Sequence, residues 1–243
     1  MKQQAKLIFY LDTKPSNDTR KIIKQDIENI SIYDIEKNKV YYINFDENIR
    51  FLKDIFEDEQ IEKFGYKLTN DYILLKQEEI TIKNIKYDAE IATYILNPND
   101  KITMDNIAMK YLEIDINSYI DEHCQSENVA QINLFETIDL EKKEEKSKYQ
   151  ASIYAYCIYQ LSQVTLKKIE EIGAKNLFEQ IDMKVVEILA DMQYQGIYVD
   201  RNELVEYGNE LKKQIEILTR EIYELTEEEF NINSTKQLRR SSI

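Results

Sequence analysis

Asp34-Ile35-Glu36 and Asp88-Ala89-Glu90 both have the form Asp-x-Glu. Carboxylates are the ligands that Mg²⁺ and Ca²⁺ prefer, so each pair is a candidate cation site. The first pair lies at an expected hairpin turn, where a solvated charge pair is the simpler interpretation. The second begins an expected helix, where Asp88 is a good N-cap and Glu90 suits the first turn. Neither pair is therefore predicted to be a ligand set.

Histidine and cysteine give no stronger signal for chemistry. The single histidine, His123, stands beside Cys124 in a polar stretch. A metal site there would need further ligands, and none is near in the sequence. Cys124 and Cys157 are too few for a disulfide framework. We expect both cysteines to be ordinary thiols.

Composition limits the classes of partner. The net charge of −14 argues against a free-standing nucleic-acid binder, so any contact with DNA has to be local. A hydrophobic content of 43% is sufficient for a packed core. No apolar run approaches the roughly 18 residues of a membrane helix, and the N-terminus lacks the features of a signal peptide. The sequence thus predicts no membrane partner and a cytoplasmic location.

Strands are predicted first and helices later along the chain. A short apolar run at Ala5–Leu11 indicates a buried strand, and residues 30–45 indicate a hairpin. Residues 114–147 are rich in charged and amide side chains and are predicted to be a long loop or a poorly packed insertion. The remaining expected elements are a strand at 61–64 and helices at 49–56, 67–76, 88–96, 103–111, 149–171, 175–194 and 201–228.

This order predicts an α/β domain followed by an all-α segment, with the boundary near Gly173. Asp200 and Glu203 form a capping box that begins the last long helix, and Ser234 with Gln237 repeats the device. A helix is thus expected to start at Ser234, although the chain ends at Ile243 with RRSSI. We therefore expect a truncated C-terminus whose last residues are not native.

Three stretches resemble bacterial family A DNA polymerases, the DNA polymerase I type. GYKLTNDYILL (65–75) with YDAEIATYILNPND (87–100) is similar to the second exonuclease motif and the helix after it. NLFEQIDMKVVEILADMQYQGIYVD (176–200) resembles the entry into the polymerase region, and EEFNINSTKQL (228–238) resembles the tip of the thumb. The resemblance implies a ribonuclease-H-like 3′–5′ exonuclease domain at 1–172 and thumb helices at 173–243.

Exonuclease domains of this family use four carboxylates to hold two divalent metal ions, and the intact polymerases depend on Mg²⁺. The resemblance places the first motif on Asp12 and Lys14, so a lysine replaces the glutamate. The second motif falls on Asp71. Counting back from Phe178 puts the third on Tyr149 and Ile153, so its aspartate is an isoleucine. With two of four carboxylates absent, we expect a vestigial site with no catalytic residue and no bound metal.

The thumb-like tip makes DNA the expected partner. Its polar residues are the candidate DNA contacts: Asn231, Asn233, Ser234, Thr235 and Lys236. The leading hypothesis is a fragment that supports DNA within a polymerase of this type but lacks palm and fingers. Two alternatives remain open, an active 3′–5′ exonuclease with substitute ligands and a non-catalytic interaction scaffold.

A heptad pattern marks the helix expected at 201–228. Leucines recur every seven residues, with isoleucines between them and a charged opposite face, which is the pattern of a two-helix seam. The resemblance implies a partner helix further along the intact chain. We therefore expect weak binding to primer-template DNA and possible self-association through this helix. The seam consists of Leu204, Leu211, Ile215, Leu218, Ile222 and Leu225.

Overall fold

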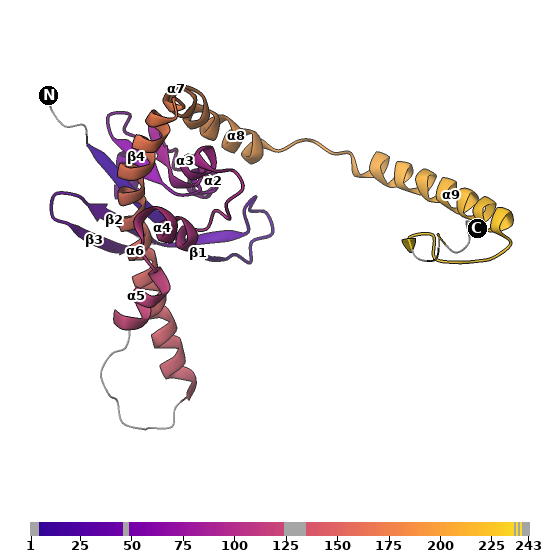
Figure 1. The fold of residues 1–243 in the computed structure, drawn as a ribbon, viewed down its shortest axis with the longest axis horizontal. Helices are drawn as coiled ribbons and strands as arrows, with labels where there is room; N and C mark the ends of the chain where they lie inside the picture. The colour runs from indigo at the N-terminus through magenta and orange to yellow at the C-terminus, as the bar shows by residue number, and fades with distance from the viewer. Residues whose placement is uncertain (1–4, 46–48, 124–134, 236, 238, 240–243) are drawn as a thin grey trace. The chain divides into compact units, whose positions relative to one another are not determined.

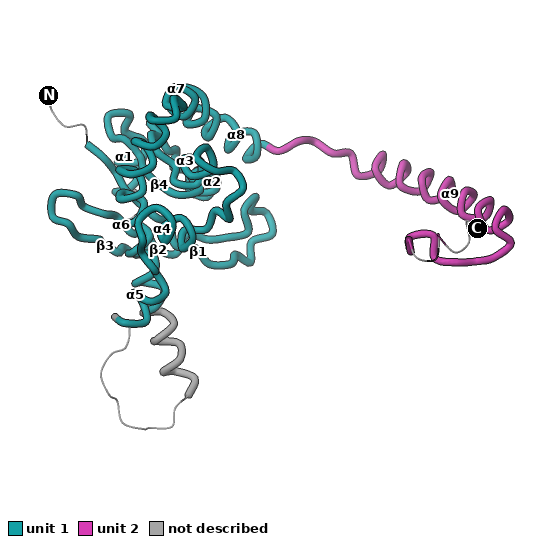
Figure 2. Tube along the Cα trace, in the orientation of Figure 1, with its two compact units in different colours: residues 1–195 teal, residues 196–243 magenta. Residues whose placement is uncertain are grey.

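The computed structural model describes residues 5–45, 49–123, 135–235, 237 and 239. The chain forms two compact units, Met1–Gln195 and Gly196–Ile243, which Figure 2 shows in different colours. Each unit is treated by itself below. Residues 173–195 belong to unit 1 by their contacts, whereas the order of predicted elements placed a domain boundary near Gly173. That domain boundary remains a prediction.

Unit 1 is built around a mixed sheet with the strand order β3-β2-β1-β4-β5. The first three strands are antiparallel neighbours, while β1, β4 and β5 run parallel. The antiparallel part confirms the predicted strand and hairpin. The β1–β2 pairing shifts register between Asp12 and Thr13, where β2 has one extra residue, Glu28, at the sheet edge discussed below. The strands are β1 Lys6–Pro15, β2 Gln25–Asp34, β3 Lys39–Asn44, β4 Glu62–Gly65 and β5 Ile85–Asp88.

Helices cover both faces of the sheet (Figure 1). Helix α6 (Phe135–Glu171) crosses the antiparallel strands on one face, where Tyr154 contacts Tyr10 and Tyr156 contacts Tyr33, edge to face. On the other face Phe56 of α1 (Ile49–Glu57) contacts Phe9 of β1. The other helices of unit 1 are α2 Leu68–Gln77, α3 Ala89–Leu96, α4 Met104–Leu112, α5 Ile116–His123, α7 Lys175–Leu177, the π-helix η1 Phe178–Asp182 and α8 Met183–Gln195.

The predicted loop at 114–147 is wrong for most of the residues that the structure describes there. Residues 116–123 form α5, and α6 already begins at Phe135. Ile116 and Ile120 lie one turn apart and are both buried, which is sufficient to anchor a short helix. The glutamates and lysines of 141–148 are strong helix formers, so a composition that resembled a loop favours a helix. Residues 124–134, Cys124 among them, lie outside the described part of the chain.

The long helix α6 is polar along much of its length. It buries Ala155, Cys157 and Ile158 against the rest of unit 1. Burial raises the pKa of the Cys157 thiol to about 12, so this cysteine remains an inert thiol as predicted. Across the described residues, no helix is both long enough and apolar enough to cross a membrane.

Unit 2 consists of α9 (Arg201–Thr226) and a segment that folds back on it. Asp200 caps the helix as predicted, because its Oδ1 accepts the amides of Asn202 and Glu203 at 2.8 and 3.3 Å. No residue of α9 is buried. After the helix ends, Phe230 returns to Tyr223, whose hydroxyl donates to the Phe230 carbonyl at 2.8 Å.

Candidate functional site: a sheet edge rich in carboxylates

Three aspartates gather where the parallel strands of unit 1 end. Asp12 lies on β1, Asp71 on α2 just beyond β4, and Asp88 closes β5. The carboxyl ends of parallel strands share one sheet edge, which is where α/β folds place their sites. The negative charges of Asp71 and Asp12 both raise the pKa of Tyr10, so these two predicted site residues both lie near that side chain.

Asp12 is held by two hydroxyl groups. Its Oδ2 accepts a hydrogen bond from Ser147 of α6 at 3.1 Å and a longer one from Tyr42 of β3 at 3.4 Å. Burial raises the pKa of Asp12, and the Ser147 hydrogen bond opposes that shift. The α6 residue that the fold brings to Asp12 is therefore a serine.

Asp71 is buried without a full set of partners. Its Oδ2 is inaccessible to solvent and has no hydrogen bond. Burial raises the pKa of Asp71 well above its usual range, the charge of Asp88 raises it further, and Lys67 opposes both effects. A carboxyl in this setting favours its protonated form.

Asp88 connects two helices. It is the N-cap of α3, as predicted, with Oδ1 accepting the amide of Glu90 at 2.8 Å. It also accepts the amides of Leu68 at 2.7 Å and Lys67 at 3.2 Å, at the start of α2. Burial raises the pKa of Asp88 to about 6 even though these amides lower it.

The second role of Asp88 was not predicted from the sequence, but a signal for it exists. Lys67 precedes α2 in a left-handed conformation and supplies no side-chain cap. The first amides of α2 therefore need an acceptor from elsewhere in the chain. The buried Asp88 supplies it.

The other residues of the predicted motifs lie apart from the three aspartates: Lys14, Tyr149 and Ile153. The Lys14 ammonium pairs with Glu28 across the β1–β2 hairpin at 3.3 Å. Tyr149 and Ile153 line a hollow beside β3, on another face of α6 from Ser147. An α-helix turns each residue by about 100°, so positions two apart, such as 147 and 149, face nearly opposite ways. The assignment of Tyr149 and Ile153 to the third motif stays a prediction.

Tyrosine side chains fill much of the space around the three aspartates. Tyr154 donates its hydroxyl to Asp105 at 3.1 Å, and Tyr66 donates to the carbonyl of Ile102 at 3.2 Å. Burial raises the pKa of Tyr10, Tyr66 and Tyr154, the last to about 12, so all three remain neutral. Within the part of the chain that the structure describes, no three His, Cys, Asp or Glu side chains are grouped to hold a metal ion.

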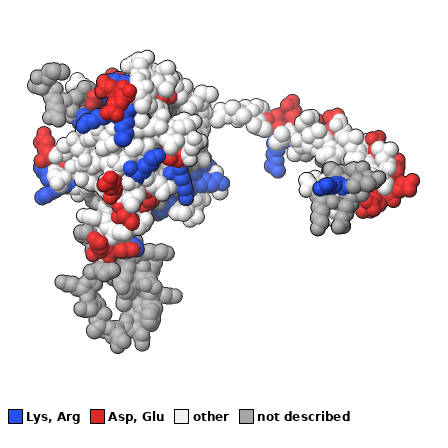
Figure 3. All heavy atoms as spheres, in the orientation of Figure 1, with Lys and Arg blue, Asp and Glu red and all other residues white. Residues whose placement is uncertain are grey.

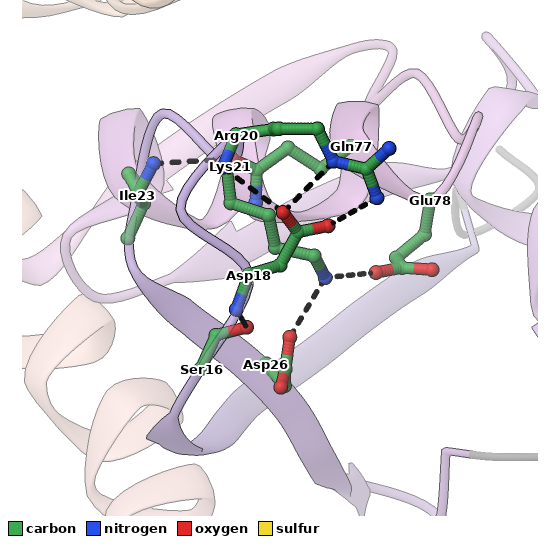
Figure 4. Close-up of polar contacts among 8 residues, drawn as sticks. All are labelled: Ser16, Asp18, Arg20, Lys21, Ile23, Asp26, Gln77 and Glu78. Carbon is green, nitrogen blue, oxygen red and sulfur yellow. Dashed lines mark hydrogen bonds and ion pairs between the residues drawn. The ribbon is translucent and has the colours of Figure 1, made fainter.

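Arg20 and Lys21, two basic side chains of the loop between β1 and β2, are paired within the chain (Figure 4). Lys21 contacts Asp26 and Glu78 at 2.8 Å each. Arg20 binds Asp18 through two nitrogens, at 3.0 and 2.8 Å. The Lys21–Glu78 contact joins the loop to the end of α2, so these ion pairs stabilise the fold and do not form an open anion site.

The predicted DNA contacts in unit 2 form a compact turn. Asn231 accepts the amide of Asn233 on its side chain at 3.0 Å and the amide of Ser234 on its carbonyl at 2.8 Å. Ser234 Oγ accepts the Gln237 amide at 3.4 Å, as the predicted cap requires. Asn233 and Thr235 are exposed. Lys236 lies outside the described residues.

Comparison with known proteins agrees with this architecture. Residues 18–123 match the ribonuclease H-like domain of DNA polymerase I. The POL domain of Pol1 from M. smegmatis, solved in complex with DNA primer-template and dNTP, has the same fold. The TM-score is 0.76 at 18% identity, over 97% of this chain and 36% of that one. The fold and the domain match thus define unit 1 as a ribonuclease-H-like domain of the exonuclease type.

Sequence relatives give the particular family. DNA polymerase I of Borreliella burgdorferi is 30% identical over 204 residues, which are 84% of this chain and 21% of that protein. DNA polymerase I of Bacillus subtilis is 27% identical over 187 residues, 76% and 20% of the two chains. The matches place this chain in the bacterial DNA polymerase I family, the family A polymerases, and confirm the predicted resemblance. The chain spans about a fifth of the length of these curated relatives.

Proposed function

We propose that unit 1 is a structural, DNA-supporting module of a DNA polymerase I-type enzyme and that its exonuclease site no longer cuts DNA. The observation that carries the proposal is the contact of Asp12 with Ser147. Two-metal hydrolysis needs several anionic oxygens around the metal ions. At the point where α6 reaches Asp12, this chain supplies a neutral hydroxyl.

The remaining donors do not fit a pair of divalent ions. Metal ligands must be deprotonated, whereas burial favours the protonated form of Asp71. Lys14, at the position of the first-motif glutamate, is occupied in an ion pair with Glu28. Among the described side chains, this sheet edge therefore lacks a complete ligand set for the Mg²⁺ on which the family depends.

The DNA-supporting part of the proposal rests on unit 2 and on charge. The exposed side chains of Asn233 and Thr235, with Lys236 beside them in sequence, are suited to phosphate contacts. On the face shown in Figure 3, both charges are mixed over unit 1 and acidic residues predominate along α9. With a net charge of −14, DNA binding by this chain is weak and sensitive to salt. In this proposal, polymerase activity requires the whole enzyme and is not a property of unit 1 or unit 2 alone.

An exonuclease assay tests the proposal. Labelled single-stranded DNA incubated with the chain and Mg²⁺ or Mn²⁺ should keep its full length. Shortening from the 3′ end that disappears in Asp12→Ala would overturn the proposal, because it would show a working site.

A rebuilding experiment tests the role of Ser147. In a Lys14→Glu background, Ser147→Asp places a carboxylate beside Asp12, whereas Ile153→Asp places one in the hollow near β3. We expect calorimetry to detect Mn²⁺ binding by the first double variant and not by the second. Binding by the Ile153 variant alone would favour the assignment from sequence.

A further inference from the structure

Strand β3 is an edge of the sheet, and its outer side pairs with no other strand among the residues that the structure describes. In Figure 1, β3 lies at the margin of unit 1. Edge strands expose main-chain N–H and C=O groups with which another strand can pair. The pairing of β2 with β3 runs without a register shift over all six residues of β3. The outer side of β3 is therefore a regular template for strand addition.

The hydrogen bonds to β2 identify the groups of β3 that face outward. The Phe45 amide donates to the Glu28 carbonyl at 3.1 Å, in the same register as the β2–β3 ladder. Antiparallel strands alternate hydrogen-bonded pairs with non-hydrogen-bonded pairs, so every second residue, counted back from Phe45, turns its main chain toward β2. The residues between them include Val40 and Tyr42. Their N–H and C=O groups therefore point away from the sheet.

The side chains of β3 favour pairing with another strand. Its sequence KVYYIN consists largely of β-branched and aromatic residues, and Lys39 is its one charged residue. The Tyr41 ring is 41% exposed, and the Lys37 ammonium lies 5.7 Å from its centre. An aromatic side chain placed opposite Tyr41 would remove apolar surface from water and add a cross-strand ring contact.

We propose that β3 pairs with β3 of a second copy of this chain, antiparallel about a two-fold axis at Tyr41. Val40 of each copy then lies opposite Tyr42 of the other. Each of these two pairs exchanges two main-chain hydrogen bonds, so the contact has four. The two Tyr41 residues form a non-hydrogen-bonded pair with Cα atoms about 4.5 Å apart. The two Lys39 residues are four positions out of register, roughly 14 Å, so their charges do not meet.

A second copy fits this edge better than a flexible peptide does. Its β3 is already extended and held by β2, so little conformational entropy is lost on pairing. The contact is also limited in size. The strand is about 20 Å long and a sheet about 10 Å thick, which gives roughly 200 Å² per copy. A stable dimer buries about 800 Å² per partner. The pair is therefore transient and depends on protein concentration, and it does not require the DNA-supporting function.

Disulfide cross-linking of the full chain tests the register. A Cα separation of about 4.5 Å permits a disulfide, so Tyr41→Cys should form a covalent dimer in the presence of oxidised glutathione. Lys39→Cys alone should give no dimer, because the two positions are roughly 14 Å apart. Mixing Lys39→Cys with Ile43→Cys should restore the dimer, because the proposed register places these residues opposite each other. No dimer from any of these variants would overturn pairing between copies and leave the edge to another kind of partner.

Controls separate this contact from other encounters between copies. Every variant also carries Cys124→Ser, because the other native cysteine is buried. Leu211→Asp and Leu218→Asp are added to remove the association expected through α9. Phe51 of α1 is 77% exposed, so Phe51→Cys reports the yield from chance collisions. Equal yields of dimer from Tyr41→Cys and Phe51→Cys would overturn the proposal.

A second experiment removes an outward donor. Val40→Pro deletes the N–H that faces the second copy and leaves the hydrogen bonds to β2 intact. Val40→Thr keeps this N–H and a branched side chain, so it is the matched control. In the Tyr41→Cys chain, Val40→Pro should slow dimer formation roughly tenfold relative to Val40→Thr, because two of the four hydrogen bonds are lost. Near-UV circular dichroism checks the fold. Equal rates from two folded variants would overturn the proposal, and if Val40→Pro does not fold, the cysteine positions decide.

Discussion

Replacing Asp71 by asparagine should stabilise unit 1 at neutral and alkaline pH. Asp71 is buried, its Oδ2 has no hydrogen bond, and nothing in the proposed function needs its charge. An unsatisfied buried polar atom costs about 1–3 kcal/mol, and more when it is charged. Asparagine keeps the shape of the side chain and leaves a neutral polar atom at that position, so the gain comes from removal of the charge. We expect a gain of about 1–3 kcal/mol at pH 8, or about 2–4 °C in Tm per kcal/mol for a domain of this size.

The gain should depend on pH with a definite sign. Because the pKa of Asp71 is raised in the folded state, the native chain binds this proton more tightly than the unfolded chain does. The stability that this group contributes is therefore fully present below the unfolded pKa of 3.8 and is lost as pH rises through the folded pKa. The Asp71→Asn variant has no ionisable group at this position, so its stability does not fall in this way as pH rises. The two proteins should be nearly equal near pH 4 and diverge as pH rises.

Chemical denaturation followed by near-UV circular dichroism, repeated from pH 4 to pH 8, measures this difference. Asp54→Asn is the matched control, because Asp54 is an exposed acid on α1, and its effect should stay within about 0.5 kcal/mol. A variant less stable than the wild type at pH 8 would refute the reasoning, since it would mean that the Asp71 charge has a partner. Stabilisation of the wild type by Mg²⁺ that is absent in Asp71→Asn would identify that partner as a metal ion.

Three further predictions concern packing. Gly65→Ala should destabilise unit 1 by about 1–3 kcal/mol in thermal denaturation, because a Cβ there would lie 2.3 Å from Cδ2 of Leu68. Gly208→Ala, with nothing within 4 Å, should instead stabilise α9 by about 1 kcal/mol. Leu211 and Leu218 are 39% and 56% exposed, so sedimentation should show concentration-dependent self-association that weakens when both become aspartate. A monomer at all concentrations would contradict that last prediction.

The sequence predicted most of the longer elements of unit 1, because their apolar patterns are local, but it assigned the first part of α6 to a loop. The short strand β5 was missed, since four residues bounded by polar ones carry too little alternation to be recognised. Helix α5 was missed because its two buried isoleucines are surrounded by polar residues in a stretch that resembles a loop. Burial against α6 decides the structure there, and that contact is not visible in a local window.

The candidate site was predictable in part. Asp12 and Asp71 were named from the sequence, and the fold brings both to the same ring, Tyr10. The α6 side chain that reaches Asp12 could not be predicted. A match to a sequence motif gives the order of the residues and not the direction in which each side chain of a helix points. A difference of two positions turns a side chain to nearly the opposite side, so Ser147 had no sequence signal. The second cap made by Asp88 depends on two segments that meet only in the folded chain.

The position of α6 in the sequence has a consequence for synthesis on the ribosome. Tyr33 of β2 packs against Tyr156 and Tyr159, which emerge roughly 120 residues later, a delay of about 6–24 s at usual elongation rates. During that interval the antiparallel strands exist without the helix that covers one of their faces. The nascent chain therefore presents a sheet surface of aromatic and aliphatic side chains, and a chaperone at the exit tunnel would protect it from aggregation until α6 arrives.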